Sequence, residues 1–442
     1  MLLIVAWLAV VLASAVTRGA YWPGGLALVV VATVALLTPV RPLPAARWTE
    51  VALWTATLFC AVLGLLDGLL GVNLLHPPLG GAGMQHIGML LHVLQVGVVL
   101  SYARPFHPWF ARRRCDARFV IALSAASALG AIAIVSWPHP LIDVFNFLNE
   151  GVKGLSRGWN PYAMHFTPLP RDVSPGYEDP AYHFDVYGYL PGTLLLTLPV
   201  VLLDDVRWLM LLAVTLAAIL LRKLSDQYQV PRPLGALTAV AFLANPGLLW
   251  VLQQAWIEPI VVCLWLAALV VHSKGRPGWS AALAGGLLSL KQHTLPLLLP
   301  LVVAGLGGRR LAAAGAVALA SCVPFLAWGP SDFVWDTLWY HVQAPARPDA
   351  LSLGGYLLRD HGVTLPGWVS AVAPAGVGAY ALWILRRYPR LGLSLRLVAA
   401  FYAALFLFNK FAFANYYFLL QTVVLVGLLG ELARDALAVD RS

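Results

Sequence analysis

The chain has 442 residues, of which 60% are hydrophobic and 11% charged, and its formal net charge is +9. Soluble domains have about 25% charged residues, so this composition and a mean hydropathy of +0.77 exclude an ordinary soluble protein. The positive charge does not indicate nucleic-acid binding, because the basic residues lie in short clusters between apolar runs.

Apolar runs of about 15–20 residues recur along the whole chain and predict an all-α polytopic membrane protein. The first run, at residues 2–16, has no basic segment before it, so we expect a membrane helix there rather than a cleaved signal peptide. We expect about 12–14 transmembrane helices. The candidate segments are 2–16, 24–40, 51–69, 87–103, 118–137, 188–203, 207–222, 233–252, 258–272, 280–303, 311–328, 367–385, 394–408 and 415–433.

The orientation follows from the basic clusters, which favour the cytoplasmic side of a membrane. These clusters lie at 104–118, 274–276, 309–310 and 386–390. The long loops 138–187 and 330–366 then face the outside. We divide the chain into N-terminal helices at 1–117, a main membrane module at 118–433 and a cytoplasmic tail at 434–442.

Two regions do not fit simple crossings. Residues 188–222 read as two short helices around Asp204 and Asp205, yet Arg222 belongs inside, so one of them is expected to be re-entrant or interfacial. Residues 280–310 must leave the cytoplasm and return, with Lys291 near the middle. Two half-helices that meet at a polar break would do this, and such a break is tolerated where it lines protein or a watery cavity.

The first outer loop begins with a helical pattern. Apolar residues at 141, 145, 148, 152 and 155 predict an amphipathic helix lying on the membrane interface. Asp143 falls in its first turn, where the helix N-terminus favours a carboxylate by ~0.3–1 kcal/mol. From spacing alone, Asp143 is either a first-turn stabiliser or a functional group, and both interpretations stay open.

After Gly158 the loop is rich in proline, which excludes a long helix. It also contains many aromatic residues, including Tyr162, Tyr187 and Tyr189. Aromatic side chains at this depth form the interfacial belt of membrane proteins. They also suit stacking on sugar rings, so the loop is either a belt or part of a substrate site.

The order of the motifs resembles that of the GT-C glycosyltransferases, and most of all glycosyltransferase family 87. Asp143, in an outer loop, follows a membrane helix. It is followed by an interfacial helix, then by Gly-Trp-Asn-Pro-Tyr at 158–162 and by Tyr-Leu-Pro at 189–191. Later stretches fit the same pattern over about residues 115–433. They are Asn245-Pro246 with Gln254 and Glu258, Leu290-Lys291-Gln292-His293, and Asn409-Lys410 with Asn415-Tyr416-Tyr417.

The resemblance implies a GT-C-like helix bundle with exoplasmic loops and interfacial helices. It also implies an enzyme that moves a sugar, mannose in this family, from a polyprenyl-phosphate donor to a hydroxyl of a glycolipid or cell-envelope glycan. The reaction would take place on the outer face of the bacterial cytoplasmic membrane. It needs no metal and no cofactor beyond the lipid-linked sugar, and no nucleic acid.

Such a transfer needs a base that accepts the hydroxyl proton. By resemblance to the first-loop aspartate of the family, Asp143 is the first candidate. His341, on the other outer loop, is the second, because imidazole titrates near neutral pH. His341 is otherwise an ordinary loop histidine near the interface.

The leaving phosphate needs cationic donors, for which Arg347, Lys410 and Lys291 are the candidates. Lys291 lies inside an apolar segment, where a charge costs ~2.5–3.5 kcal/mol. That cost predicts a partner or a cavity for its ammonium group.

The other candidate substrate contacts lie at helix ends and in the loops. Glu258 either pairs with a cation, binds sugar hydroxyls, or is a first-turn carboxylate beside Pro259. Asn415 and Tyr416 are either donor contacts or interface anchors. The full set is Asn160, Tyr162, Tyr189, Gln254, Glu258, Gln292, His293, Asn415 and Tyr416.

A multi-pass transporter or flippase for lipids or lipid-linked sugars is the main alternative, because it would explain the polar break and Lys291. Transporters often have paired halves with matching interruptions, whereas this chain has an unpaired loop at 138–187. An enzyme like the O-antigen ligases would also use outer-loop arginine and histidine, but it would not need Asp143.

Overall fold

The structure is a computed structural model that describes all residues except 18, 39–45, 71–81, 103–114, 169–185 and 440–442. Within the described ranges the chain forms helices and turns, with one isolated bridge between Ala20 and Ala350. The protein is therefore all-α, as the sequence predicts. Most of the predicted cytoplasmic cluster at 104–118 lies outside the described residues.

Eight helices in the described part of the chain are long and apolar enough to cross a membrane. They are α3 (Ala46–Leu70), α4 (Ala82–Leu100), α5 (Cys115–Ser136), α9 (Arg207–Gln227), α15 (Gly308–Trp328), α19 (Gly367–Arg387), α20 (Leu391–Phe408) and α21 (Ala414–Val439). The described part also contains five shorter apolar helices. These are α1 (Leu2–Ala15), α2 (Pro23–Leu37), α10 (Arg232–Leu243), α12 (Glu258–Ser273) and the segment Gln292–Val303.

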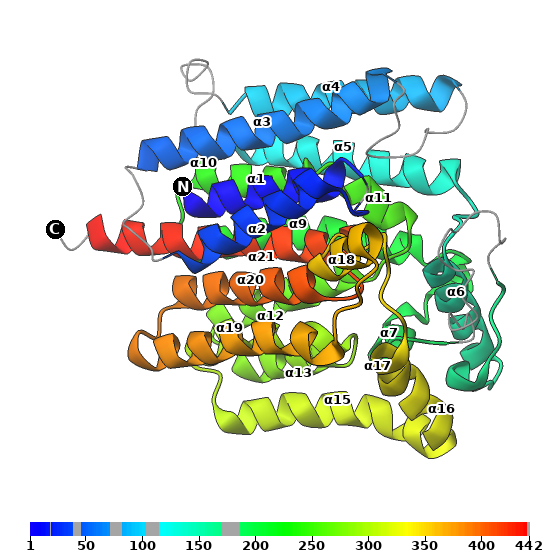
Figure 1. Cartoon of the computed structure of the whole chain (residues 1–442). Helices are drawn as coiled ribbons and strands as arrows, with labels where there is room; N and C mark the ends of the chain where they lie inside the picture. Colours follow the sequence, from blue (N-terminus) through cyan, green and yellow to red (C-terminus); the bar gives the residue numbers. More distant parts are fainter. Residues whose placement is uncertain (18, 39–45, 71–81, 103–114, 169–185, 440–442) are drawn as a thin grey trace.

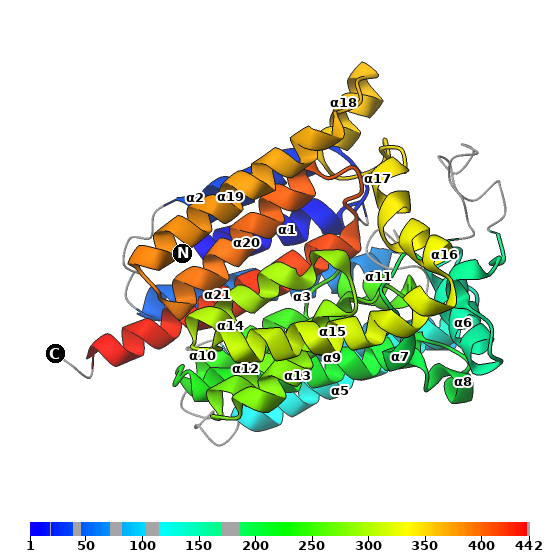
Figure 2. The ribbon, with the colours of Figure 1, turned by 90° about the horizontal axis from the view of Figure 1, so that it is seen from below.

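The helices run roughly along one axis and form a bundle with two distinct ends (Figures 1 and 2). One end, on the right in Figure 1, is covered by short helices and loops, and we call it the capped end. Its short helices are α6 (Asp143–Ser156), η3 (Pro161–Ala163), α16 (Pro330–Val334), the π-helical turn η6 (Trp335–Trp339), α17 (Tyr340–Gln343) and α18 (Leu353–His361). The C-terminus lies at the opposite end.

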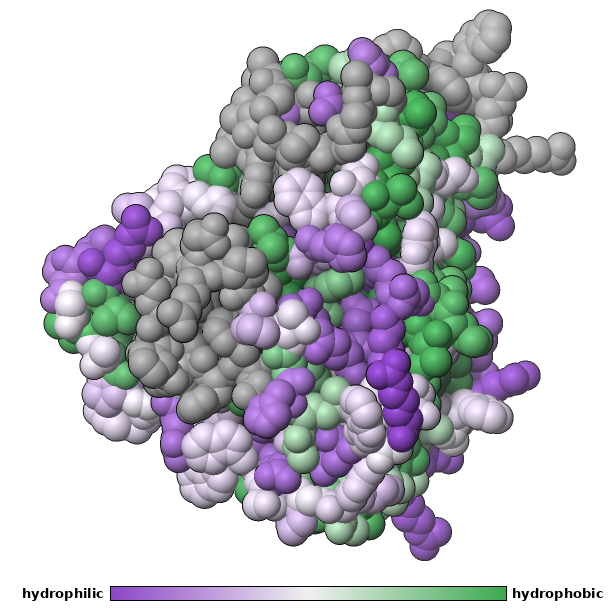
Figure 3. Space-filling view, turned by 90° about the vertical axis from the view of Figure 1, so that its right-hand side faces the viewer, coloured by the Kyte–Doolittle hydropathy of each residue, from purple (hydrophilic) through white to green (hydrophobic). Residues whose placement is uncertain are grey.

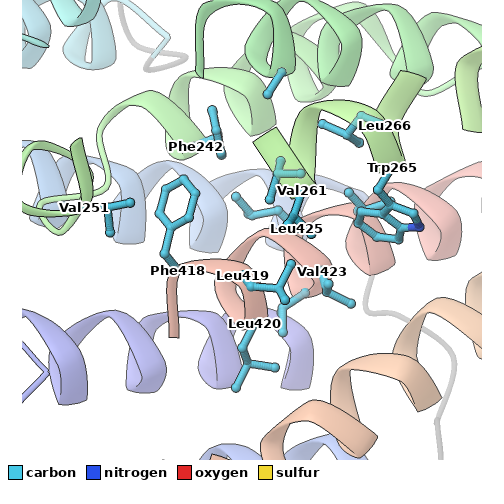
Figure 4. Packing of buried hydrophobic residues seen from close by; sticks show 14 of the residues in the cluster. Phe242, Val251, Val261, Trp265, Leu266, Phe418, Leu419, Leu420, Val423 and Leu425 are labelled. Atoms are coloured by element: carbon cyan, nitrogen blue, oxygen red, sulfur yellow. The ribbon is translucent and has the colours of Figure 1, made fainter. Parts of the chain in front are cut away.

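The core lies around α21, in whose apolar stretch 89% of the residues are buried. Figure 4 shows side chains of α10, α12 and α21 packed together in this core. The rings of Phe242 and Phe418 have centroids 5.7 Å apart, and Trp265 donates its indole N–H to the Leu297 carbonyl at 2.8 Å. This packing fixes the first turns of α12 and α21, which bear several of the candidate site residues.

Residues 188–222 contain one crossing helix and two short ones. The predicted helix at 188–203 is instead α7 (Pro191–Thr197) and α8 (Val200–Leu203), which are too short to span a bilayer, and α9 makes the crossing. Pro199 separates the two pieces, and α8 ends at Asp204 in a left-handed conformation with φ of 60°. One predicted helix is thus replaced by a short segment that stays near the capped end, where Figure 1 shows α7.

The predicted polar break at 280–310 is confirmed. Helix α13 (Pro277–Leu288) ends before Lys291, whose backbone is extended. The chain then turns through η5 (Gln292–Leu298) into α14 (Leu299–Val303). The two half-helices make a hairpin with a lysine at its tip.

At the C-terminus, the predicted tail at 434–442 continues α21 as far as Val439. Four of the six residues at 434–439 are arginine, alanine or leucine, which are strong helix formers. The helix predicted in the first outer loop is present as α6. Its Leu148 and Val152 are buried as predicted, whereas Leu141 precedes the helix and is exposed.

Candidate active site

An extended segment, residues 187–190, lies at the centre of the capped end. The Gly188 carbonyl accepts hydrogen bonds from His341 Nε2 at 2.8 Å and from Gln292 Nε2 at 3.3 Å. The Tyr189 carbonyl accepts the hydroxyl of Tyr162 at 2.9 Å. This segment therefore connects the first outer loop, the polar break and the second outer loop.

The start of α7 lies directly on the polar break. The backbone N–H of Leu190 donates to the Leu290 carbonyl at 3.2 Å, and that of Gly192 donates to the Ser289 carbonyl at 2.9 Å. A Cβ on Gly192 would lie 2.7 Å from the Ser289 carbonyl oxygen, so the approach requires glycine. The contact places Tyr189 beside Lys291.

Lys291 belongs to a group of buried polar residues that we call the buried cluster: Tyr189, Glu258, Lys291, Asn415 and Tyr416. Lys291 Nζ is 2.6 Å from Glu258 Oε1, and Asn415 Nδ2 donates to the same oxygen at 3.0 Å. The ammonium also lies 4.8 Å from the ring centroid of Tyr189 and 5.4 Å from that of Tyr416. Glu258 is thus the partner that the cost of burying Lys291 predicts.

The buried cluster forms where helices begin or break. Glu258 is in the first turn of α12, Asn415 is in the first turn of α21, and Lys291 lies between the two half-helices. Helix N-termini have partial positive charge and unpaired N–H groups, which favour a carboxylate. The relative exposure is 0% for Glu258 and 5% for Lys291, so these charges stabilise each other in a protein interior.

Two buried oxygen atoms of this cluster have no hydrogen-bond donor among the described residues. They are Glu258 Oε2 and Asn415 Oδ1. A buried acceptor without a donor costs about 1–3 kcal/mol. A ligand that brings hydroxyl groups would satisfy both atoms.

Asp143 is the first residue of α6, and its Oδ1 accepts the N–H of Val144 at 2.8 Å. Asp143 is half-buried. Burial raises the pKa of Tyr340 to about 12, and the negative charge of Asp143 adds to this effect. The pKa of Tyr189 is raised mainly by burial, then by Glu258, with Asp143 contributing. The Asp143 carboxylate therefore accepts a backbone N–H at the start of α6 and also lies within electrostatic range of Tyr189 and Tyr340.

The surroundings of His341 favour its neutral form. Burial lowers its pKa, and the positive charges of Lys291 and Lys410 lower it further, although the hydrogen bond to Gly188 opposes this. In the neutral imidazole, Nε2 bears the hydrogen that it donates to the Gly188 carbonyl. The other nitrogen, Nδ1, then has a free lone pair in that tautomer.

The two remaining cations are joined through the backbone. Arg347 makes a two-bond contact with Asp349, at 2.8 Å and 2.5 Å, and its own N–H donates to the Lys410 carbonyl at 3.2 Å. Lys410 Nζ donates to the carbonyls of Val342, at 3.0 Å, and Ala344. Burial lowers the pKa of Lys410. Arg347 lies in the segment that follows His341, and Lys410 lies in the segment that follows α20. Both cations have hydrogen-bond partners within the protein.

The other predicted residues surround the site to different extents. Gln292 also donates to the Thr337 carbonyl at 2.8 Å. The His293 ring packs 5.6 Å from that of Tyr416, and its Nε2 has no hydrogen-bond partner among the described residues. Asn160 caps η3 and Tyr162 is buried against Phe333, so these two support the extended segment. Gln254 ends α11 (Leu248–Gln253), four residues before Glu258, without a recorded side-chain contact to the buried cluster in the described part.

Sequence reasoning missed three residues that shape the site. Asp336 is buried and accepts the N–H of Tyr187 at 2.7 Å, which fixes the start of the extended segment. Asp349 holds Arg347, and the Arg-x-Asp spacing could have indicated this pair. Arg207 is buried at the end of α9 nearest Asp143. It occupies the first position of the predicted segment 207–222, and no sequence motif marks it.

Seen from outside, the capped end has hydrophilic side chains across its middle and apolar ones beside them (Figure 3). Exposed leucines lie along the two short helices that follow Tyr189 and in the turn between them. They include Leu195, Leu198 and Leu202, the last with 89% of its surface exposed. A polar site with an apolar approach suits a substrate that has both a sugar and a lipid part.

The model of glycosyltransferase family 87 matches residues 187–408 of the chain. The match begins at the extended segment and includes Glu258, Lys291, His341 and Arg347. Asp143, Lys410 and Asn415 lie outside it. No curated protein matches the chain.

Proposed function

Since the chain belongs to glycosyltransferase family 87 and is thus a membrane glycosyltransferase, we propose that it transfers mannose from a polyprenyl-phosphate donor to a hydroxyl group of a glycolipid or cell-envelope glycan. The proposal includes the side of the membrane. Basic residues such as Arg309 and Arg386 lie at the end opposite the capped end, which favours a cytoplasmic location for that end. The capped end then faces outward from a bacterial cytoplasmic membrane.

One observation supports this chemistry best, namely that Asp143 lies within electrostatic range of Tyr189, a member of the buried cluster. The Asp143 carboxylate and the Glu258 carboxylate both raise the pKa of Tyr189. His341 is held to the residue before Tyr189. A candidate base, a sugar-binding group and a lysine therefore surround one tyrosine.

The proposed reaction is a direct displacement. The acceptor hydroxyl oxygen attacks C1 of the mannosyl group while the Asp143 carboxylate accepts its proton. The bond between C1 and the phosphate oxygen breaks, and its electron pair leaves with the polyprenyl phosphate. Arg347, Lys410 and Lys291 stabilise the phosphate, because hydrogen bonds from cations are strongest to ionised acceptors.

The buried cluster would hold the sugar. Glu258 Oε2 and Asn415 Oδ1 are acceptors without donors among the described residues, and a mannosyl group has several hydroxyl donors. Lys291 gives one of its three N–H groups to Glu258. The exposed leucines of α7 and α8 offer an apolar path for the prenyl chain. The substrates would thus be a lipid-linked sugar and a glycan acceptor, and the enzyme would need no metal.

The test is transfer of labelled mannose from polyprenyl-phosphate mannose in membranes that contain the wild type or Asp143→Asn at equal protein levels. A control variant, Glu150→Gln, changes another carboxylate on the same helix, whose Oε2 accepts the N–H of Thr167 at 3.0 Å. We expect transfer by the wild type, near-complete loss in Asp143→Asn, and a change of about twofold or less in Glu150→Gln.

Other outcomes would contradict parts of the proposal. Equal transfer by the wild type and Asp143→Asn would move the base to His341. No transfer from polyprenyl-phosphate mannose, arabinose or glucose would favour the transporter alternative. The polar break at Lys291 is the observation that keeps this alternative open, and it would be tested by movement of a labelled lipid across vesicles that contain the protein.

A further inference from the structure

We propose that Arg207 is a positioning residue that fixes the Asp143 carboxylate for catalysis; this rests on the proposed role of Asp143 as the base. Arg207 is the first residue of α9 and has a relative exposure of 0%. It touches neither the buried cluster nor Asp143 in the described contacts, so it would act through the segments that it binds.

The guanidinium group binds the end of the helix that precedes Asp143. Its Nη1 donates to the Trp137 carbonyl at 2.7 Å, and its Nη2 lies 3.3 Å from the Ile134 carbonyl and 3.4 Å from that of Pro138. Carbonyl groups at a helix C-terminus lack partners within the helix and interact favourably with cations. Arg207 thereby fixes the end of α5 and the first residues of the turn that leads to Asp143.

Asp205 holds the guanidinium in place. Its two carboxylate oxygens accept from Arg207 Nε at 3.0 Å and from Nη2 at 2.6 Å. The Arg207 backbone N–H also donates to Asp205 Oδ1 at 2.9 Å. These bonds fix the orientation of the planar guanidinium group. The remaining N–H donors then point at the carbonyls at the end of α5.

The same corner of the chain, residues 204–207, also holds α6 directly. The guanidinium carbon of Arg207 lies 5.0 Å from the ring centroid of Phe145. One turn later, Asn149 Oδ1 accepts the N–H of Val206 at 3.1 Å, and a further turn later Lys153 pairs with Asp204. Residues 145, 149 and 153 are four apart, so they form one stripe along α6.

Asp143 thus begins a helix that is held on both sides of its first turn. The turn before it is bound through the carbonyls of residues 134–138, and the helix after it is bound through the stripe. Arg207 takes part in both. A shift of a catalytic group by about 1 Å can cost about 100-fold in rate, so loss of this clamp would lower the rate without removing any group from the substrate site.

Arg222 offers a matched control on the same two helices. It is also buried, and it contacts Asp116 at the start of α5 and Asp226 on α9, at the end far from Asp143. Arg207→Lys and Arg222→Lys therefore weaken the same α5–α9 pair at opposite ends. Lysine keeps the charge but loses the planar fork of donors.

The experiment measures kcat and KM for donor and acceptor in the wild type, Arg207→Lys and Arg222→Lys. It also follows amide hydrogen exchange of residues 137–148 in each purified protein. We expect Arg207→Lys to lower kcat about 10- to 100-fold while both KM values change by about threefold or less, and to speed exchange in residues 137–148. Arg222→Lys should leave kcat within about twofold and exchange there unchanged.

A second variant, Phe145→Leu, keeps the proposal testable if Arg207→Lys does not fold. It removes the ring beneath the guanidinium, and a smaller fall in kcat with faster exchange is expected. Equal losses of kcat in Arg207→Lys and Arg222→Lys, or unchanged exchange in residues 137–148 of Arg207→Lys, would overturn the proposal. The exchange result is independent of transfer activity, so it also distinguishes failure of this inference from failure of the proposed function.

Discussion

At the scale of single residues, the site is defined by side chains whose charges are balanced before any substrate binds. Lys291 is matched by Glu258, Arg347 by Asp349, and Lys410 by backbone carbonyls. Such pairing explains how cations persist in a mostly apolar protein. To bind a phosphate, these cations must therefore share their N–H donors with it or release them from their present partners.

The Lys291–Glu258 pair makes a clear prediction about stability. Glu258→Gln leaves a buried ammonium without its counter-charge, and removal of one partner of a buried pair costs about 3–5 kcal/mol. We expect a large fall in the melting temperature of the purified protein. The double variant Glu258→Gln with Lys291→Met removes both charges and should regain much of that stability, while transfer stays lost. A single variant as stable as the wild type would contradict the structure of the pair.

His341 predicts a pH dependence. Its folded-state pKa is lowered by burial and by nearby lysines, whereas the unfolded chain binds the proton at about pH 6.5. Between these two values the unfolded state binds more protons, so the stability that His341 contributes is complete above about pH 6.5 and is lost as the pH falls toward the folded pKa.

The measurement is the melting temperature at about pH 7.5 and about pH 5.5, on either side of the usual histidine pKa. His341→Gln keeps a donor for the Gly188 carbonyl but does not titrate. We therefore expect acidification to lower the melting temperature more in the wild type than in the variant. Equal falls in both proteins would show that His341 is not the group responsible.

At the scale of helices, the site depends on one close contact between the start of α7 and the polar break. Gly192→Ala would place a Cβ 2.7 Å from the Ser289 carbonyl oxygen, and such overpacking costs about 1–3 kcal/mol. We expect a lower melting temperature and reduced transfer, because Tyr189 and Lys291 would separate. Activity assays and thermal unfolding in detergent would measure both effects.

Gly286→Ala is the matched control for this change. Gly286 lies on α13, three residues before Ser289, and a Cβ there would meet its nearest atom at 3.8 Å. That is an ordinary contact, and alanine is the better helix former by about 1 kcal/mol. If both alanine variants behaved like the wild type, the contact between α7 and the break would not be needed.

The elements also show what the sequence could and could not predict. Apolar residues at helical spacing were enough to predict α6, and the cost of burying Lys291 was enough to predict a partner or a cavity for its ammonium group. Arg207 and Arg396 lie in the predicted segments 207–222 and 394–408, but no motif indicates that they bind carbonyls at the ends of α5 and α2. Those contacts join residues that are 70 and 360 positions apart, so no local pattern contains them.

At the scale of the whole molecule, the proposed orientation can be tested directly. Ser156 is exposed at the capped end, and Lys274 is exposed at the end of α12 that leads away from it. In a cysteine-free background, Ser156→Cys should react with a membrane-impermeant maleimide on intact spheroplasts. Lys274→Cys should react only after the membrane is opened. The reverse pattern would place the site on the cytoplasmic side.

Apolar runs predicted the all-α polytopic fold, and the order of the motifs pointed to most of the residues that meet at the site, because that order reflects the family. The sequence predicted that one of the two helices in 188–222 does not cross, but not which one, because the leucines of α7 and α8 look like those of any membrane segment. It also gave no sign that Asp336 would hold the start of the extended segment. Partners across long sequence separations are set by packing, and a single sequence does not contain that information.

The position of Lys291 at the tip of a hairpin has a consequence for how the protein is made. Glu258 is synthesised 33 residues before Lys291, on the helix that packs beside the first half of the hairpin. The counter-charge is therefore already in the membrane when the lysine leaves the ribosome and must be inserted. Asn415 arrives only with the last helix, so the polar centre of this enzyme is neutralised early and completed at the end of translation.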